Sequence, residues 1–444
     1  MRLVRVFFFL TLSVAITCCA EPALKLEAVT DRDLYLADAG NLIYTQINLS
    51  SAIESPRARS KSIRNIAFVI DRSGSMAGEP IQAIRQAIPI ALNSLSERDV
   101  VSVVLFGSEV KALIEARRRD QLKDFDALLS QTEPVGGASL YDALNQGAAQ
   151  LRRYAGVNTV NQLILISDGQ PTKGPREFDD FSRLVELFAK ENISVSAIGV
   201  GMEFNEDLLA GIARAGNGRF LYVESATKLS EVLQAELDPE RQLVARDIVL
   251  TIDFGRGCEK AETYGWTPAD VKEQNVSYRI PYFFAGQTLR LLTSAKMRPR
   301  RGSFELAKIK LSWIEVSNGA TQQTILPVQV VLDGDLEAVR RSANVAVLRT
   351  TVNTVISEGL ERSIEEIDKG DFRRAIRALR RARADALSLN FRVDDEEAIA
   401  SIKRLETYLA EVQKRGMNRL DRKVLRSGLF NQFDSPTAEN KADN

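Results

Sequence analysis

The sequence IAFVIDRSGSM at residues 66–76 decides the fold class of the chain. Its first five residues are apolar without polar alternation, which indicates a strand buried on both faces, as in a parallel sheet. The run ends at Asp71, and Ser73 and Ser75 follow at two-residue spacing with Gly74 between them. We therefore expect one carboxylate and two hydroxyls on a loop at the carboxyl end of a strand, where open α/β sheets bind ligands.

These oxygen donors suit a hard divalent cation, because carboxylate and hydroxyl oxygens are ligands that Mg²⁺ and Mn²⁺ accept. The alternative is an ordinary turn, since Asp, Ser and Gly are frequent in turns. The chain contains no histidine, which excludes His-ligated zinc and catalysis by Ser-His-Asp or Cys-His groups. A metal in this protein must therefore be held mainly by oxygen.

Between about residues 64 and 236 apolar strands alternate with amphipathic helices, which predicts a parallel sheet with right-handed crossovers. The predicted strands after the first are residues 100–106, 162–166, 193–200 and 219–223. The predicted helices are residues 80–95, 138–153, 177–191, 205–215 and 228–236.

Two later stretches fit the first loop. LILISDGQPT at residues 163–172 places Asp168 at the end of a second buried strand. GGASLYDAL at residues 136–144 precedes a helix, and Ser139 is a candidate N-cap for that helix, with Asp142 three residues on.

The three stretches together resemble the metal-ion-dependent adhesion site of the von Willebrand factor A domain. In that family the first motif is DxSxS, the second is GGTxLxxAL with a Thr that binds the ion directly, and the Asp of the third usually reaches the ion through water. The resemblance implies a fold with a six-stranded, mostly parallel, Rossmann-like sheet and helices on both faces. It also implies one Mg²⁺ or Mn²⁺ ion held by Asp71, Ser73, Ser75 and Asp168.

The chain departs from the family pattern at Ala138, which stands where the second motif has Thr. A methyl group cannot ligate a metal. Either the adjacent Ser139 hydroxyl replaces the Thr oxygen, or a water fills the position and metal affinity falls. One hydroxyl cannot easily serve both as a ligand and as a helix cap, so both roles of Ser139 stay open.

After residue 239 the hydrophobic period changes to two, which predicts an antiparallel β-sandwich. Its predicted strands are residues 248–254, 276–282, 288–292, 309–313 and 325–331. Two earlier strands, at residues 24–29 and 42–49, are too few to fold alone. We therefore expect them to complete the sandwich, with the A domain inserted into it. This layout resembles secreted bacterial A-domain proteins similar to calcium-activated chloride-channel regulators and inter-alpha-trypsin-inhibitor heavy chains.

The C-terminal region has helical periodicity, with predicted helices at residues 343–368, 371–389 and 396–414. The second helix is rich in arginine, which superficially suggests nucleic acid. Lys plus Arg and Asp plus Glu both number 59, so no global charge favours nucleic acid or an anionic membrane. A solvated or ion-paired helix face is the preferred interpretation, and no nucleic-acid partner is expected.

Residues 1–20 have the pattern of a secretory signal, with Arg2 and Arg5 before an apolar stretch too short to span a membrane. We expect cleavage after Ala20 and a periplasmic or extracellular location. The alternative is a lipoprotein signal, in which lipidation of Cys18 or Cys19 would be the protein's one link to a membrane.

The predicted domains are a signal peptide (1–20), N-terminal sandwich strands (21–62), the A domain (63–238), the β-sandwich (239–334), a helical hairpin or bundle (335–431) and a disordered tail (432–444). The predicted function is metal-dependent protein binding, in which the ion accepts an Asp or Glu carboxylate from a protein partner. The alternative is a structural envelope scaffold whose site is metal-free or purely structural because of Ala138. We do not expect an enzyme. Metal-assisted hydrolysis needs a base beside an activated water, and this chain has no histidine and only one carboxylate clearly at the ion.

Overall fold

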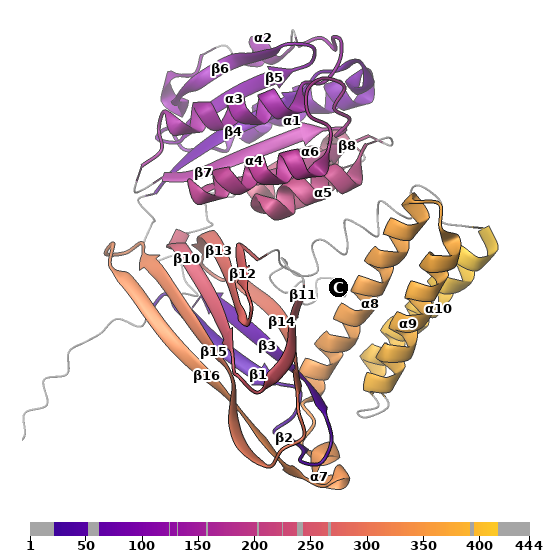
Figure 1. Ribbon diagram of the computed structural model, residues 1–444. Helices are drawn as coiled ribbons and strands as arrows, with labels where there is room; N and C mark the ends of the chain where they lie inside the picture. Colours follow the sequence, from indigo (N-terminus) through magenta and orange to yellow (C-terminus); the bar gives the residue numbers. More distant parts are fainter. Residues whose placement is uncertain are drawn as a thin grey trace, which may run out of the picture.

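The computed structural model describes residues 22–51, 62–123, 125–130, 132–156, 159–201, 204–223, 225–237, 243–264, 268–390 and 395–415. The described residues form an α/β unit, a β-sandwich and a group of C-terminal helices (Figure 1). The predicted signal peptide (1–20), with its two cysteines, and the predicted tail (432–444) lie outside the described residues. Cleavage and lipidation therefore stay predictions, as do the domain boundaries.

One six-stranded sheet forms the α/β unit. Its strands, in spatial order, are β6 (Val110–Arg118), β5 (Val100–Phe106), β4 (Ile63–Asp71), β7 (Thr159–Ser167), β8 (Ile193–Val200) and β9 (Asn217–Val223). The edge strand β6 is antiparallel to β5, and every other neighbouring pair is parallel. The predicted six-stranded, mostly parallel sheet is therefore confirmed.

Helices cover both faces of this sheet because the side chains of β4 alternate between two apolar clusters. Ala67 and Val69 pack on the face covered by α3, α4 and α5, whereas Ile66, Phe68 and Ile70 pack on the face covered by α1, α2 and α6. All five side chains are at most 1% exposed. The helices are α1 (Glu79–Asn93), α2 (Phe125–Ser130), α3 (Leu140–Arg152), α4 (Phe178–Lys190), α5 (Glu206–Ala215) and α6 (Ala226–Glu236), with the short 3₁₀ turns η1 (Gly74–Met76) and η2 (Arg119–Gln121).

Two further sheets stack as the β-sandwich. The four-stranded sheet has the order β1-β3-β14-β11 and the six-stranded sheet β12-β13-β10-β15-β16-β2. The strands are β1 (Leu24–Thr30), β2 (Leu34–Leu36), β3 (Asn41–Ser51), β10 (Leu243–Phe254), β11 (Cys258–Tyr264), β12 (Asp270–Lys272), β13 (Asn275–Phe284), β14 (Thr288–Met297), β15 (Gly302–Glu315) and β16 (Thr321–Gly334). Since β3 lies between β1 and β14, the strands before the α/β unit complete the sandwich formed by the strands after it. The predicted insertion is confirmed.

One edge of the sandwich corrects the prediction that it is wholly antiparallel. The short strand β2 pairs in parallel with the end of β16. Residues 31–33 carry the chain from the four-stranded sheet to the six-stranded sheet. Because a sheet edge offers unpaired N–H and C=O groups, β2 adds to the free edge of β16 and does not form a hairpin with β1.

The sandwich holds the α/β unit at the amino-terminal ends of its parallel strands. The Tyr282 hydroxyl, on β13, accepts a hydrogen bond from Asn161 N at 2.9 Å and donates one to Asn192 O at 2.5 Å. Val160 and Leu243 pack with Tyr282 in a small apolar cluster at this junction. The carboxyl ends of the strands, where Asp71 lies, are therefore at the opposite end of the α/β unit from the sandwich (Figure 1).

The C-terminal helices are α7 (Leu336–Arg341), α8 (Val345–Asp368), α9 (Phe372–Asn390) and α10 (Glu396–Arg415). The last three pack around one apolar cluster that includes Val352, Leu379 and Leu405. An ion pair of 3.1 Å between Arg214 on α5 and Glu361 on α8 joins this group to the α/β unit. The predicted C-terminal helical region is confirmed. Among the described residues, no helix is both long enough and apolar enough to cross a membrane.

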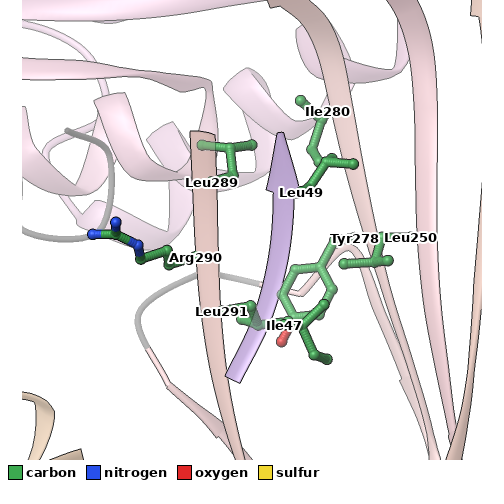
Figure 2. A pocket seen from close by; sticks show the side chains of 8 residues that line it. All are labelled: Ile47, Leu49, Leu250, Tyr278, Ile280, Leu289, Arg290 and Leu291. Carbon is green, nitrogen blue, oxygen red and sulfur yellow. The ribbon is translucent and has the colours of Figure 1, made fainter. Parts of the chain in front are cut away.

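A small apolar pocket lies between the two sheets of the sandwich (Figure 2). Its lining residues are Ile47, Leu49, Leu250, Tyr278, Ile280, Leu289, Arg290 and Leu291. Figure 2 shows the Arg290 guanidinium pointing away from the other lining side chains. The pocket therefore lacks the convergent polar groups that orient a ligand, and we assign it to imperfect packing of the two sheets.

Candidate metal-binding site

Asp71 is the last residue of β4 and is 0% exposed. Its Oδ1 accepts a hydrogen bond from Ser73 N at 2.8 Å, and its Oδ2 accepts one from the Ser167 hydroxyl at 2.5 Å. Burial is the largest influence on this carboxyl and raises its pKa to about 6, although both hydrogen bonds lower the pKa. The nearby Asp168 charge raises it further. A cation beside Asp71 would favour the charged carboxylate instead.

The first loop brings Ser73 and Ser75 together. Their hydroxyl oxygens lie 3.0 Å apart. The 3₁₀ turn η1 produces this approach, because Met76 N donates to Ser73 O at 3.0 Å and folds the chain back. Ser73 is buried and Ser75 is exposed, so the pair extends from the Asp71 carboxylate toward solvent. The three residues predicted from DxSxS therefore lie in one continuous cluster.

The second loop, residues 135–139, is hydrogen-bonded to the first. Gly74 N donates to Gly136 O at 3.0 Å, and Val135 N donates to Arg72 O at 2.7 Å. Ser139 occupies the N-cap position of α3, but its hydroxyl makes no cap hydrogen bond. Of the two roles left open for Ser139, the structure therefore does not show the helix-capping hydrogen bond. The residue is buried, with 6% exposed.

The third loop begins at Asp168, directly after β7. Asp168 Oδ1 accepts a hydrogen bond from Gln170 N at 3.1 Å. Its Oδ2 is buried and has no hydrogen-bond partner among the described residues. Because a buried carboxylate oxygen is costly when it is unpaired, this atom is the feature of the site that most needs a cation or an ordered water.

Sequence reasoning missed two polar residues that the fold brings to these loops. Ser167 binds Asp71 through its hydroxyl, and Thr172 Oγ1 accepts a hydrogen bond from Ala138 N at 2.7 Å. A signal for Ser167 was available, since it directly precedes Asp168 and terminates the strand beside β4. The Thr172 contact joins loops 34 residues apart, and no local pattern indicates it.

The donor set fits a hard divalent ion. It offers the Asp71 and Asp168 carboxylates with the paired hydroxyls of Ser73 and Ser75, and oxygen-only donors suit Mg²⁺ or Mn²⁺. Within the described part of the chain, no group of three or more His, Cys, Asp or Glu side chains is placed to hold a metal. A metal here would therefore depend on hydroxyl and water oxygens as well as carboxylates.

Comparisons with known proteins identify the family of the α/β unit. A family model described as the von Willebrand factor type A domain matches residues 64–221. These residues form a von Willebrand factor type A domain. The match begins in β4 and ends in β9, so it includes part or all of every strand of the α/β sheet and leaves out Ile63 and residues 222–223.

Two relatives extend the comparison by sequence. YfbK of Escherichia coli (strain K12) is 22% identical over 306 residues, which cover 64% of this chain and 53% of that protein. The inter-alpha-trypsin inhibitor heavy chain H2 of Homo sapiens is 29% identical over 164 residues, which cover 35% of this chain and 17% of the heavy chain. The predicted resemblance to these heavy chains is confirmed. The matches span only about half of one relative and a sixth of the other.

Two solved structures share the overall fold. A von Willebrand factor type A protein from Catenulispora acidiphila has a TM-score of 0.70 at 14% identity, covering 92% of this chain and 96% of that one. The ArnB paralog VWA2 from Sulfolobus acidocaldarius has a TM-score of 0.64 at 17% identity, covering 94% of this chain and 100% of that one. At these identities the likeness shows the fold. It extends beyond the A domain to the sandwich and the C-terminal helices.

Proposed function

We propose that this chain is an exported, metal-dependent protein-binding module. Its A domain holds one Mg²⁺ or Mn²⁺ through Asp71, Ser73 and Ser75, with Asp168 acting through a water. The observation that carries the proposal is the buried Asp168 Oδ2, which has no hydrogen-bond partner among the described residues. Asp168 directly follows Ser167, whose hydroxyl donates to Asp71. When bound, the ion would supply an electrophilic position for a carboxylate.

The position of the site supports a protein partner. It lies at the end of the A domain opposite the sandwich, so neither the sandwich nor its junction covers it. Val135 on the second loop is 49% exposed, and Lys173 on the third loop is exposed. An Asp or Glu of a partner would bind the ion while these side chains contact its surroundings. The partner is therefore a protein with an exposed acidic residue.

The test is isothermal titration calorimetry of Mg²⁺ and Mn²⁺ into the metal-stripped full chain. We expect saturable 1:1 binding that Asp71→Ala abolishes. The control is Asp120→Ala, which removes a more exposed carboxylate, paired with Arg118, from the same domain. Free metal at about 100 times its Kd should raise the free energy of unfolding by about 2.7 kcal/mol. Binding unchanged in Asp71→Ala would contradict the proposal.

A structural scaffold is the second candidate function, and one observation favours it. Both Asp71 oxygens already accept protein hydrogen bonds, and Ala138 removes the hydroxyl that the family pattern has at that position. The site would then hold its loops without an ion. The same titration separates the two candidates, because a scaffold predicts no binding and no effect of Asp71→Ala on capture of a partner.

We propose no enzymatic activity for the chain. The chain has no histidine to act as a base near a metal-bound water. The proposed location is the periplasm or the extracellular space. A lipid anchor at Cys18 or Cys19 remains the alternative to a freely diffusing protein.

A further inference from the structure

Thr172 is held against the residue that lacks the expected third hydroxyl. Ala138 N donates to Thr172 Oγ1 at 2.7 Å. In the opposite direction, Ala138 O accepts from Thr172 N at 3.0 Å and from Lys173 N at 3.1 Å. Three hydrogen bonds therefore fix Thr172 and Lys173, on the third loop, to both backbone polar groups of Ala138.

The approach of Thr172 depends on the glycine at position 137. A Cβ added there would lie 2.3 Å from Thr172 Oγ1, so a side chain at position 137 would force this hydroxyl to move. The loop is also tied on its outer side, because Lys173 Nζ donates to Ser108 O at 3.1 Å and an Arg176 guanidinium donates to Thr172 O. The Thr172 hydroxyl is therefore held in place by several contacts.

The Thr172 hydroxyl contacts the second loop of the metal site, and that loop is hydrogen-bonded to the first. Gly136, two residues before Ala138, accepts a hydrogen bond from Gly74, which lies between the two site serines. Thr172 itself follows Asp168 by four residues, and Asp168 carries the buried oxygen without a hydrogen-bond partner among the described residues. The Thr172 hydroxyl therefore joins the second loop, where Ala138 lacks a ligand oxygen, to the third loop, which carries the unpaired Asp168 Oδ2.

We propose that Thr172 supplies the hydroxyl oxygen that Ala138 cannot, so that the metal site is completed from the third loop. A hydroxyl has two acceptor lone pairs. Ala138 N–H uses one of them, and the other remains to coordinate the ion. Thr172 is exposed and its hydroxyl is fixed beside Ala138, so an incoming carboxylate can approach an ion held there from solvent. This inference rests on the proposed metal-binding function.

The experiment is Mn²⁺ titration calorimetry on the full chain. Thr172→Val keeps the shape of the side chain and removes its oxygen. We expect Mn²⁺ affinity to fall roughly tenfold or more, because loss of even a supporting partner of a metal ligand typically costs about 10–100-fold. Thr172→Ser keeps the oxygen and should retain wild-type affinity. Ser139→Ala is the matched control and should also retain it. Circular dichroism confirms that each variant is folded.

A rescue variant separates a ligand from a residue that only supports the loop. In Ala138→Thr/Thr172→Ala the hydroxyl returns to the second loop, and we expect Mn²⁺ affinity to recover over that of Thr172→Ala alone. Ala138→Thr in the wild-type background is the comparison. If Thr172 already fills this ligand position, the added hydroxyl should change Mn²⁺ affinity little there, whereas a supporting role predicts the same gain in both backgrounds.

The outcomes distinguish this inference from the function on which it rests. Wild-type affinity in Thr172→Val overturns the inference alone, as does a loss seen only in Ser139→Ala or a failed rescue. If the wild-type protein binds no Mn²⁺, the inference and the proposed metal-binding function both fail.

Discussion

The buried Asp71 carboxylate receives its two hydrogen bonds from different parts of the chain. Ser73 N is two residues away, whereas the Ser167 hydroxyl is 96 residues away. The first bond follows from the local DxSxS turn and is therefore predictable. The second exists because β4 and β7 are parallel neighbours in register, which brings the ends of both strands to the same level of the sheet. Local spacing therefore indicates one of the two hydrogen bonds of Asp71, and only the sheet register explains the other.

Ser167→Ala should destabilise the metal-free protein. The substitution removes the donor to Asp71 Oδ2 and leaves a buried carboxylate oxygen unpaired, which costs about 1–3 kcal/mol. Urea denaturation of the metal-stripped chain measures the change. Ser102→Ala is the control, because that buried hydroxyl makes only a 3.4 Å bond to Ile66 O and its loss should cost less. An equal or larger loss in Ser102→Ala would contradict the account of Asp71.

The elements with the clearest sequence patterns were the ones most easily predicted. β4 is a continuous apolar run, and its burial on both faces was expected. β6 and β11 were missed because they are edge strands with many exposed charged residues, and an edge strand needs only one apolar face and one partner. The count of six strands in the A domain came from the family resemblance and not from the periodicity.

The packing of α3 on the sheet was not predictable from its amphipathic pattern, although α3 begins directly after the second site loop. Gly147 lets the helix approach the sheet: a Cβ there would lie 2.5 Å from Val69 Cγ2 and 2.9 Å from Leu163 Cδ1. Gly147→Ala should therefore destabilise the protein by about 1–3 kcal/mol through overpacking, although alanine favours helix by about 1 kcal/mol.

Thermal denaturation measures this effect, and Ala149→Gly calibrates the propensity contribution. Ala149 is exposed on the same helix, so its replacement should cost only the helix preference, about 1 kcal/mol. If Gly147→Ala raised the melting temperature, the close approach of α3 to the sheet would not be required for stability.

At the scale of the whole molecule, α8 brings the Glu358 carboxyl close to the four-stranded sheet of the sandwich. Burial is the largest influence on the pKa of Glu358 and raises it, and the Glu361 and Glu262 charges raise it further. Arg362, 3.5 Å away, lowers it. Glu262 lies on β11, so the two carboxylates repel each other across the contact between helix and sheet.

Glu358→Gln should stabilise the protein at pH 7, and the gain should disappear on acidification. A folded-state pKa raised above 4.5 means that the folded protein binds the proton more tightly. The protonated group therefore contributes stability below pH 4.5, and that contribution is lost as the pH rises through the folded-state pKa. Urea unfolding at pH 4 and pH 7 measures the difference.

The control for Glu358→Gln is Glu337→Gln, which changes an exposed carboxyl with a 70% exposed side chain on α7. We expect it to shift stability little at either pH. A variant Glu358→Gln that is less stable than wild type at pH 7 would mean that the Arg362 ion pair outweighs burial.

The sequence by itself determined the fold class, the insertion of the A domain into a sandwich, and the loops that carry Asp71, Ser73, Ser75 and Asp168. The alternation of strands and helices follows from hydrophobic periodicity, which acts over a few residues, whereas the six-stranded count and the ligand set came from the resemblance of three short motifs to a known family. Only the tertiary structure decided that Ser167 binds Asp71, that Asp168 Oδ2 is buried without a hydrogen-bond partner among the described residues, and that Thr172 lies against Ala138. The physical reason is that these contacts join different strands and loops, and the sheet register that brings them together is set by the packing of the whole domain.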